Sequence, residues 1–412
     1  MRILVVNDEL NHHTSVPKLV HQLARHLHAR RHDVTVLGTV RNLRDEGERN
    51  DAGVRVITIR SDYRPRFRAW RGVYNPQTVP KFRAILARLK PDVVHFHNVH
   101  THLSFACLHL ARRAGARVFL TAHDVMLFWD GKLVCFDETT TRDDVRRGTV
   151  DYRYRWWRAV RAHRLRYLPF RNALVRRRVA TDVEQLVSVS DVLGQALTAN
   201  GYCQPTTIHN GTARDGWRSA PGDVDRFKRR FGLDGSQVVL SGGRLSYLKG
   251  MDHLLRAVAG LSHEWVKLVI VGRGSDAYER HLRALAERLG IATQVVFAGW
   301  LDLGELASAF ACAAVCVNPS LCFETLSMFN LEAMMAERPV VSTFFGGPAE
   351  TIVEGESGLF VNPYDTAALT ERIGAVLSND TTACEMGARG RARALERFDE
   401  ATQTAKVCEL YG

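Results

Sequence analysis

Short apolar runs alternate with helical stripes along the first half of the chain. Runs typical of buried strands lie at residues 3–7, 33–38, 54–59, 92–97, 118–124 and 186–190. Apolar side chains recur at helical spacing between the first two runs, at Val16, Leu19, Val20, Leu23 and Leu27, and further helices are predicted at 76–90, 103–114 and 191–200. This alternation predicts a parallel sheet with helices on both of its faces.

The second half starts a new set of alternations. Apolar runs that begin near residues 238, 266, 294, 314, 339 and 358 predict the strands of a second sheet, and helices are predicted at 251–261, 366–377 and 386–411. The polar, glycine-bearing stretch 211–222 between the halves is typical of a linker. A chain of 412 residues fits two domains better than one core. We place them at 1–210 and 211–395, and expect a C-terminal helix at about 396–412 to join the first.

Two carboxylates lie where a buried strand passes into a helix, in the stretch 318–333. Glu324 is expected in the first turn of this helix, where the positive end of the helix dipole favours an anion. Glu332 follows eight residues later, about two turns on, so that one face would present both acids to a single ligand. The alternative is a solvated helix with one favourable N-terminal acid and one surface acid.

Glycine turns with basic residues follow the strands of the second half. Arg244 and Lys249, five residues apart in a turn that leads into a helix, can converge on one pyrophosphate. The full Gly-x-x-x-x-Gly-Lys-Ser/Thr pattern is missing, which excludes an ATPase phosphate loop. Glycine turns recur after Val271 and Phe297.

Histidines gather near the ends of two strands of the first half. His95, His97, His100 and His102 suggest a metal site at first sight, but no carboxylate or cysteine completes a set at ligand spacing. We expect no metal there and assign His97 to a ligand-binding edge. His123 ends the next strand, where open α/β sheets bind their ligands.

The composition narrows the class of protein. Eight scattered cysteines without a Cys-x-x-Cys pair indicate reduced thiols, and the N-terminus lacks the apolar core of a signal peptide, so we expect a cytoplasmic protein. No apolar run is long enough for a transmembrane helix. The formal net charge of +12 implies a field that attracts phosphates, anionic lipid or nucleic acid.

Much of this charge lies in the segment 151–178, where arginines are mixed with aromatic residues. The spacing predicts two helices that are broken at Pro169. The segment suits a peripheral contact with anionic lipid head groups at the inner face of the plasma membrane. A cover helix with solvated arginines is the alternative, and nucleic acid is not expected because no recognition motif accompanies the charge.

These motifs together resemble a known family. Residues 238–363 resemble the nucleotide-sugar-binding domain of the retaining family 4 glycosyltransferases, whose GT-B fold has two Rossmann-like, doubly wound domains facing a central cleft. The matching motifs are Gly243-Arg244-Leu245 with Lys249-Gly250, Val271-Gly272-Arg273-Gly274, Phe297-Ala298-Gly299, Glu324 with Glu332-Ala333, Arg338-Pro339-Val340-Val341, Gly346-Gly347-Pro348-Ala349-Glu350 and Glu354-Gly355-Glu356-Ser357-Gly358.

The first half resembles the acceptor domain of that family less closely. It matches at Val93-Val94-His95-Phe96-His97, Thr121-Ala122-His123-Asp124, Val189-Ser190 and Asn210-Gly211. The loop at 8–18 departs from the family, because relatives usually have a glycine pair where this chain has none, and a phosphate or acceptor contact is not carried over to it. Thr325 and Ser327 also stand where many relatives have small residues or glycine, a difference that bears on sugar preference.

The resemblance implies a metal-independent, retaining hexosyltransferase without a cofactor. Its substrates would be a nucleoside diphosphate sugar, a UDP-sugar before a GDP-sugar, and a hydroxyl of a glycan, lipid-linked or small-molecule acceptor, joined in an α linkage. Arg244 and Lys249 would neutralise the leaving pyrophosphate, Glu324 would contact the donor sugar, and His123 would contact its hydroxyls. The implied donor-binding set is Gly243, Arg244, Lys249, Gly272, Gly299, Trp300, Thr325, Leu326, Ser327 and Glu332, with Glu332 on the ribose.

Two other classes compete with a transferase. A GT-B relative such as a nucleotide-sugar epimerase would share the donor site, and a non-catalytic nucleotide-binding or lipid-binding protein would bind without turnover. The presence together of His123, Arg244, Lys249 and Glu324 disfavours the second.

Overall fold

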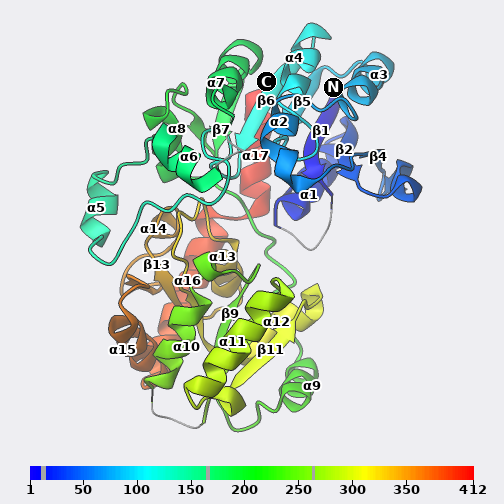
Figure 1. Cartoon of the computed structure of the whole chain (residues 1–412). Coiled ribbons are helices and arrows are strands. Elements are labelled where there is room, and N and C mark those ends of the chain that lie inside the picture. Colours follow the sequence, from blue (N-terminus) through cyan, green and yellow to red (C-terminus); the bar gives the residue numbers. More distant parts are fainter. Residues whose placement is uncertain (11–14, 164–167, 262–264) are drawn as a thin grey trace. The chain divides into compact units, whose positions relative to one another are not determined.

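A computed structural model describes residues 1–10, 15–163, 168–261 and 265–412. The chain forms two compact units (Figure 1). The first comprises Met1–Gly131, Tyr152–Gly211 and Glu400–Gly412, and the second comprises Lys132–Asp151 and Thr212–Asp399. Residues 132–151 therefore group with the second unit, although they lie within the range 1–210 that the sequence assigns to the first domain. Residues 11–14 of the glycine-free loop and residues 164–167 of the basic segment lie outside the described ranges.

The first unit is built on an eight-stranded sheet in the order β3-β4-β2-β1-β5-β6-β7-β8. All neighbours pair in parallel except β3 and β4, which form an antiparallel edge hairpin that the apolar pattern does not predict. The strands are β1 Arg2–Glu9, β2 Asp33–Val40, β3 Gly47–Asp51, β4 Val54–Arg60, β5 Val93–Phe96, β6 Arg117–Ala122, β7 Gln185–Ser188 and β8 Thr206–Thr207. The chain order reverses between β1 and β5, which makes their carboxyl ends a switch point where ligands bind in such sheets.

Helices cover both faces of this sheet, as the alternation predicts. The helices are α1 Ser15–Ala29, α2 Arg68–Val73, α3 Val79–Leu89, α4 Ala106–Arg113, α6 Trp156–His163, α7 Arg171–Asp182, α8 Asp191–Ala199 and α17 Glu400–Tyr411, with the short 3-10 helices η1 Leu43–Asp45 and η2 Pro65–Phe67. On one face, α1 and α17 pack together over the buried residues of β1, β2 and β4. On the other face, Phe82 of α3 contacts Phe96 of β5.

The second unit has a six-stranded, fully parallel sheet in the order β11-β10-β9-β12-β13-β14. Its strands are β9 Gln237–Gly242, β10 Val266–Val271, β11 Val295–Gly299, β12 Ala313–Asn318, β13 Val340–Thr343 and β14 Leu359–Val361. In chain order this is 3-2-1-4-5-6, the arrangement of a dinucleotide-binding sheet, with its switch point between β9 and β12.

The helices of the second unit also lie on both faces. They are α5 Arg142–Arg147, α9 Pro221–Phe231, α10 Met251–Ala259, α11 Asp276–Arg288, α12 Leu303–Cys312, α13 Met328–Met335, α14 Pro348–Thr351, α15 Thr366–Leu377 and α16 Asp380–Arg397, with η4 Tyr247–Lys249 and η5 Ala292–Gln294. Buried residues of α10, α11 and α15 form one core with alternate residues of β9, β10 and β12. Phe310 of α12 and Phe329 of α13 contact each other in a separate cluster.

Two helix predictions need correction. The helix predicted at 386–411 is two helices, because it breaks at Phe398 and Asp399. There the carbonyl of Phe398 accepts a hydrogen bond from the N–H of Thr212, and the buried carboxylate of Asp399 accepts one from Arg214 at 2.8 Å. These long-range bonds compete with the helical ones. The second correction concerns the helix after β12, which begins only at Met328.

In the described part of the basic segment there are two helices, α6 and α7. Helix α6 ends at His163 and α7 begins at Arg171, with Pro169 between them. Among the described residues, no helix combines the length and the hydrophobicity needed to cross a lipid bilayer.

Candidate functional site

Three glycine turns lie next to one another at the carboxyl ends of β9, β10 and β11. The N–H of Gly272 donates to the carbonyl of Gly299 at 2.7 Å, and the N–H of Gly243 donates to Val271 at 2.9 Å. Gly272 has a φ of +111°, and a Cβ on it would lie 2.0 Å from the carbonyl oxygen of Gly243. Only glycine allows this approach, which keeps the strand ends open to a ligand.

The loop after β9 is held against the loop after β12. Gly250, with a φ of +72°, begins α10, and a Cβ there would lie 1.8 Å from the carbonyl oxygen of Pro319. The carbonyl of Leu248 accepts hydrogen bonds from the N–H of Leu321 at 2.9 Å and from the hydroxyl of Ser320 at 3.2 Å. These contacts join the two loops that flank the switch point of the sheet.

This junction places Lys249 against Glu324. The ammonium Nζ of Lys249 donates to Oε1 of Glu324 at 2.5 Å, and the hydroxyl of Ser320 donates to the same oxygen at 2.5 Å. The side chain of Lys249 is 22% exposed and that of Glu324 only 9%. The structure thus brings two of the predicted site residues into direct contact.

The charges of this pair shift both pKa values. Burial by itself would raise the pKa of Glu324, but the positive charges of Lys249 and Lys132, with the two hydrogen bonds, lower it to about 2. Burial would lower the pKa of Lys249, and the carboxylate of Glu324 outweighs it, so that this pKa is raised. Both groups are therefore charged at neutral pH.

The structure corrects the predicted position of Glu324. It lies four residues before α13, in an extended segment that bridges Gly346, and not in the first turn of the helix. Ser327 is the N-cap of α13, and its hydroxyl accepts from the N–H of Asn330 at 3.3 Å. Glu332, half-buried, lies on the helix itself, so one helical face does not present both acids.

Two glycines allow this segment to pack closely. A Cβ on Gly346 would lie 2.3 Å from the carbonyl oxygen of Glu324, and one on Gly347 would lie 2.2 Å from that of Thr325. The N–H of Glu324 donates to Phe345 at 2.9 Å. The glycine pair that the resemblance singles out therefore fixes the backbone of the candidate acid.

Sequence reasoning missed two neighbours of Glu324. Ser320 lies within the crossover stretch, and its hydroxyl on a short loop after a strand was an available signal. Lys132 is distant in sequence and carried no such signal. Its segment packs here because the N–H of Phe323 donates to the carbonyl of Leu133, and Phe136 stacks on Phe345 with 4.3 Å between ring centres.

The other residues of the predicted donor set lie at these same strand ends in the second unit. Arg244 is exposed in the turn after Gly243, and Trp300, 45% exposed, follows Gly299. Thr325 is half-buried and Leu326 is buried, both between Glu324 and the N-cap of α13.

In the first unit, His123 belongs to a row of stacked imidazoles. Nε2 of His123 lies 2.8 Å from Nδ1 of His97, and the ring of His97 stacks on that of His95 with 4.6 Å between centres. His95 contacts the hydroxyl of Tyr411 through Nδ1 at 2.6 Å and that of Thr121 through Nε2 at 2.8 Å. Both nitrogens of His95 are thus in hydrogen bonds, which leaves it no lone pair for a metal.

Burial keeps these imidazoles neutral. It lowers the pKa of His95 to about 3 and that of His123 to about 4, and it lowers the pKa of His97 well below its ordinary value. Neutral rings share one hydrogen at each contact, so the His97–His123 bond restricts the tautomer of His123.

Comparisons with known sequences match both halves of the chain. Residues 223–393 match the family described as Glycosyl transferases group 1, and residues 16–215 match Glycosyltransferase Family 4. The chain is 32% identical over 206 residues to the GDP-mannose-dependent alpha-(1-6)-phosphatidylinositol monomannoside mannosyltransferase of Mycolicibacterium smegmatis, a match over 48% of this chain and 54% of that protein. It is 40% identical over 168 residues to the D-inositol 3-phosphate glycosyltransferase of Acidothermus cellulolyticus, over 38% and 37% of the two chains. These matches span about half or less of the relatives' length.

Solved structures share the fold over almost the whole chain. The sucrose-phosphate synthase of Thermosynechococcus elongatus superposes with a TM-score of 0.78 at 20% identity, over 100% of this chain and 98% of that one. HepE of Anabaena in complex with UDP-glucose superposes with a TM-score of 0.75 at 17% identity, over 100% and 99%. With two parallel α/β sheets, two family matches that span both units and this shared fold, the chain belongs to the family 4-like glycosyltransferases of GT-B fold.

Proposed function

We propose that the protein is a metal-independent, retaining glycosyltransferase that moves a sugar from a UDP- or GDP-sugar to an acceptor hydroxyl in an α linkage. The observation that carries this proposal is the buried Lys249–Glu324 pair at the switch point of the second sheet. Ligands bind at such points, and the open glycine turns beside the pair suit a diphosphate. The Mycolicibacterium relative is named as a GDP-mannose-dependent alpha-(1-6) mannosyltransferase, which agrees with this proposal.

Glycosyl transfer needs a positive and a negative protein charge close to each other in the donor site. When the bond to the donor sugar breaks, negative charge grows on the departing pyrophosphate and positive charge on the sugar ring. Lys249 and Arg244 are the cations assigned to the pyrophosphate, and the carboxylate of Glu324, ionised at any physiological pH, is assigned to the sugar. Because two cationic side chains supply the charge, a divalent metal is not needed.

The remaining roles follow the family resemblance. Glu332 is assigned to the ribose hydroxyls and His123 to hydroxyls of the donor sugar. A neutral imidazole, as burial imposes on His123, can donate or accept one hydrogen bond at the nitrogen that does not bond His97, according to its tautomer, which suits a hydroxyl. The leaving phosphate oxygen would take the proton of the acceptor on the same face, so that the anomeric configuration is kept.

We also propose peripheral contact with anionic lipid through the basic segment 151–178, at the cytoplasmic face of the membrane. Exposed aromatic side chains support this: Trp156 and Trp157 on α6 and Phe170 before α7 are 62%, 51% and 71% exposed. Aromatic rings among arginines suit the interface between head groups and acyl chains.

The test is a thermal-shift panel of UDP-, GDP- and ADP-sugars, followed by NMR of the product formed from the best donor. We expect one nucleotide class to raise the melting temperature, and an α-linked product from an α-donor in the presence of EDTA. A β-linked product would overturn retention, and loss of turnover in EDTA would overturn metal independence. Deuterium incorporated from solvent at the sugar C2 without transfer would identify an epimerase instead.

A further inference from the structure

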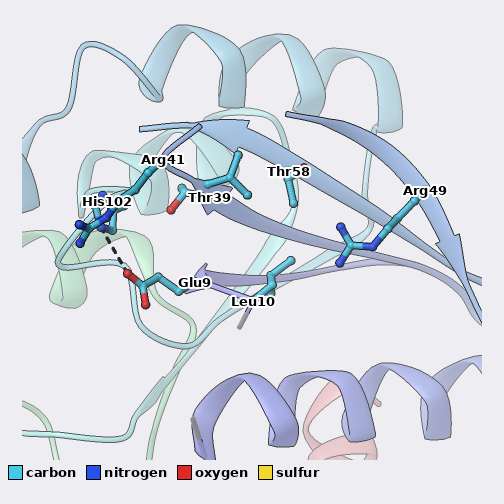
Figure 2. Close-up of a pocket in the computed structure, with 8 residues that line it drawn as sticks. Glu9, Leu10, Thr39, Arg41, Arg49, Thr58 and His102 are labelled. Atoms are coloured by element: carbon cyan, nitrogen blue, oxygen red, sulfur yellow. Dashed lines mark ion pairs between the residues drawn. The ribbon is translucent and has the colours of Figure 1, made fainter. Parts of the chain in front are cut away.

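A pocket lies beside the switch point of the first sheet, within the first unit (Figure 2). Its cavity volume is about 440 Å³. The lining residues come from the ends of β1 and β2, the β3–β4 hairpin and the loop after β5: Glu9, Leu10, Thr39, Val40, Arg41, Arg49, Thr58 and His102. None of them belongs to the donor site described above.

The wall of this pocket is rigidly built around Asp8. Its buried carboxylate accepts three backbone N–H groups from the loop after β5, from Thr101 at 2.7 Å, His102 at 2.9 Å and Leu103 at 2.7 Å. The carbonyl of His102 in turn accepts from the side chain of Asn75 at 2.5 Å. The backbone that carries His102 is therefore held in place before any ligand arrives, which lowers the entropic cost of binding.

The imidazole of His102 adds a polar atom to this wall. His102 is 5% exposed, and its buried Nε2 makes no hydrogen bond among the described residues, which leaves it the long contact to Glu9. It lies 3.5 Å from Oε1 of Glu9, the contact that Figure 2 marks with a dashed line. Buried polar atoms without a partner are rare, so Nε2 indicates a place where a ligand or water completes the site.

The floor between the polar groups is apolar. Leu10 lies between Glu9 and Arg49 in Figure 2 and packs on Gly38, where a Cβ would come within 2.3 Å of its side chain. An apolar floor with a few polar groups around it is the usual composition of a small-molecule site.

The charge balance of the pocket favours an anion. Arg41 and Arg49 line it, and neither forms an ion pair with any of the described residues. The two acids of β3 are already paired, Glu48 with Arg88 and Asp51 with Arg25, and Glu46 just before the strand pairs with Lys81. Within the described ranges, this leaves two guanidinium groups without an ion pair in the lining of the pocket, against the single carboxylate of Glu9.

We propose that this pocket binds an acceptor that carries an anionic group, a phosphate monoester or a carboxylate, on a hydroxylated ring. Arg41 and Arg49 would hold the anion, because guanidinium groups bind phosphate and carboxylate with two parallel hydrogen bonds. Glu9 and His102 would bind hydroxyls of the ring. This inference rests on the proposed function only in calling the ligand an acceptor, and its binding can be measured without turnover.

The test compares charged and neutral probes of the same shape by isothermal titration. Glucose 6-phosphate and glucuronate should bind at least about tenfold more tightly than glucose to the wild-type protein. The double variant Arg41→Gln/Arg49→Gln should lose this preference, at an unchanged melting temperature. Arg44→Gln, at an exposed arginine of η1 between β2 and β3 that does not line the pocket, is the matched control and should keep this preference.

Glu9→Gln makes the test sharper, because it should act in the opposite direction. Removing the single negative charge of the lining should tighten glucose 6-phosphate binding several-fold, whereas a variant that merely damages the fold would weaken it. Equal affinity for glucose and glucose 6-phosphate, an unchanged preference in the double arginine variant, or weaker phosphate binding in Glu9→Gln would each overturn the proposal.

Two further experiments ask whether the anion comes from a lipid head group and whether the probe binds at the donor site instead. Vesicles that contain phosphatidic acid are compared with pure phosphatidylcholine, and binding that depends on Arg41 and Arg49 would identify a lipid head group as the source. Lys249→Ala should leave glucose 6-phosphate binding intact, so a failure of the proposed transfer reaction would be distinguishable from a failure of this pocket. If Lys249→Ala abolishes binding of the probe, the phosphate occupies the donor site and the proposal is wrong.

Discussion

Lys249 donates a 2.5 Å hydrogen bond to Glu324 although the two residues lie in the connections that follow two different strands of the second sheet, β9 and β12. Each residue has its charge stabilised by the other, and each is assigned a charge that grows during transfer. We predict that Lys249→Ala and Glu324→Ala each lower kcat/KM by on the order of a hundredfold or more, the scale of losing a contact to the transition state.

The control for this prediction is Lys267→Ala, since that lysine binds only the carbonyl of Thr293 among the described residues. Melting temperatures of all three variants show whether a loss of activity reflects unfolding. Near-normal kcat/KM in either site variant would remove that residue from the mechanism.

His97→Phe should impair the reaction without disrupting the fold. The substitution keeps an aromatic ring to stack on His95 but removes the nitrogen that bonds His123. We expect kcat to fall by on the order of tenfold, because His123 loses a group that restricts its tautomer. The nitrogen chemical shifts of His123 should report a changed tautomer population. An unchanged spectrum together with reduced kcat would contradict the positioning role.

The free energy of unfolding should decrease as the pH falls, because buried histidines are protonated less readily in the folded chain than in the unfolded one. The pKa of His123 is lowered from 6.5 to about 4, so the unfolded chain binds a proton more readily than the folded one. The contribution is complete above pH 6.5 and is lost as the pH falls toward 4, by roughly 2 kcal/mol at about pH 5. In urea denaturation, the free energy of unfolding should decrease less between about pH 7 and pH 5 for His123→Gln than for the wild type. The control His28→Gln, at an exposed histidine, should behave as the wild type.

Gly250→Ala should separate the two loops of the donor site. The φ of +72° disfavours any other residue, and the added methyl would collide with the carbonyl of Pro319. We expect the free energy of unfolding to fall by more than about 1 kcal/mol and activity to fall with it. Gly222→Ala is the matched control, since nothing lies within 4 Å of a Cβ there, and it should be close to neutral. Wild-type activity in Gly250→Ala would show that the loop contact is dispensable.

Trp156→Ser/Trp157→Ser should weaken binding to vesicles with anionic lipid. Both rings are more than half exposed, and their transfer into the interface contributes apolar burial that salt does not screen. Cosedimentation should show weaker vesicle binding of the double variant than of the wild type at both low and high salt. Trp265→Ser, at a site 53% exposed in the second unit, should bind as the wild type. If the wild-type protein does not bind these vesicles at low salt, the membrane proposal is wrong and α6 is a surface helix with solvated arginines.

Periodicity alone predicted most of the fold. Helix α15 spans the predicted range 366–377, and nearly every predicted strand of both sheets is present with shifts of one or two residues at its ends. Apolar periodicity reports which face of an element is buried, and that is a local property of the chain. The antiparallel strand β3 was missed because its five residues carry no apolar alternation and are held only by pairing with β4.

The sequence by itself predicted the candidate site residues, through its glycine turns and through Arg244, Lys249, Glu324 and His123. Only the tertiary structure decided that Lys249 touches Glu324, that α13 starts after Glu324, and that Ser320 and Lys132 act on its charge. It alone brought Arg41, Arg49 and His102 to one pocket. Helix and strand periods arise from neighbours along the chain, whereas these contacts arise from strand order, which places distant strand ends side by side.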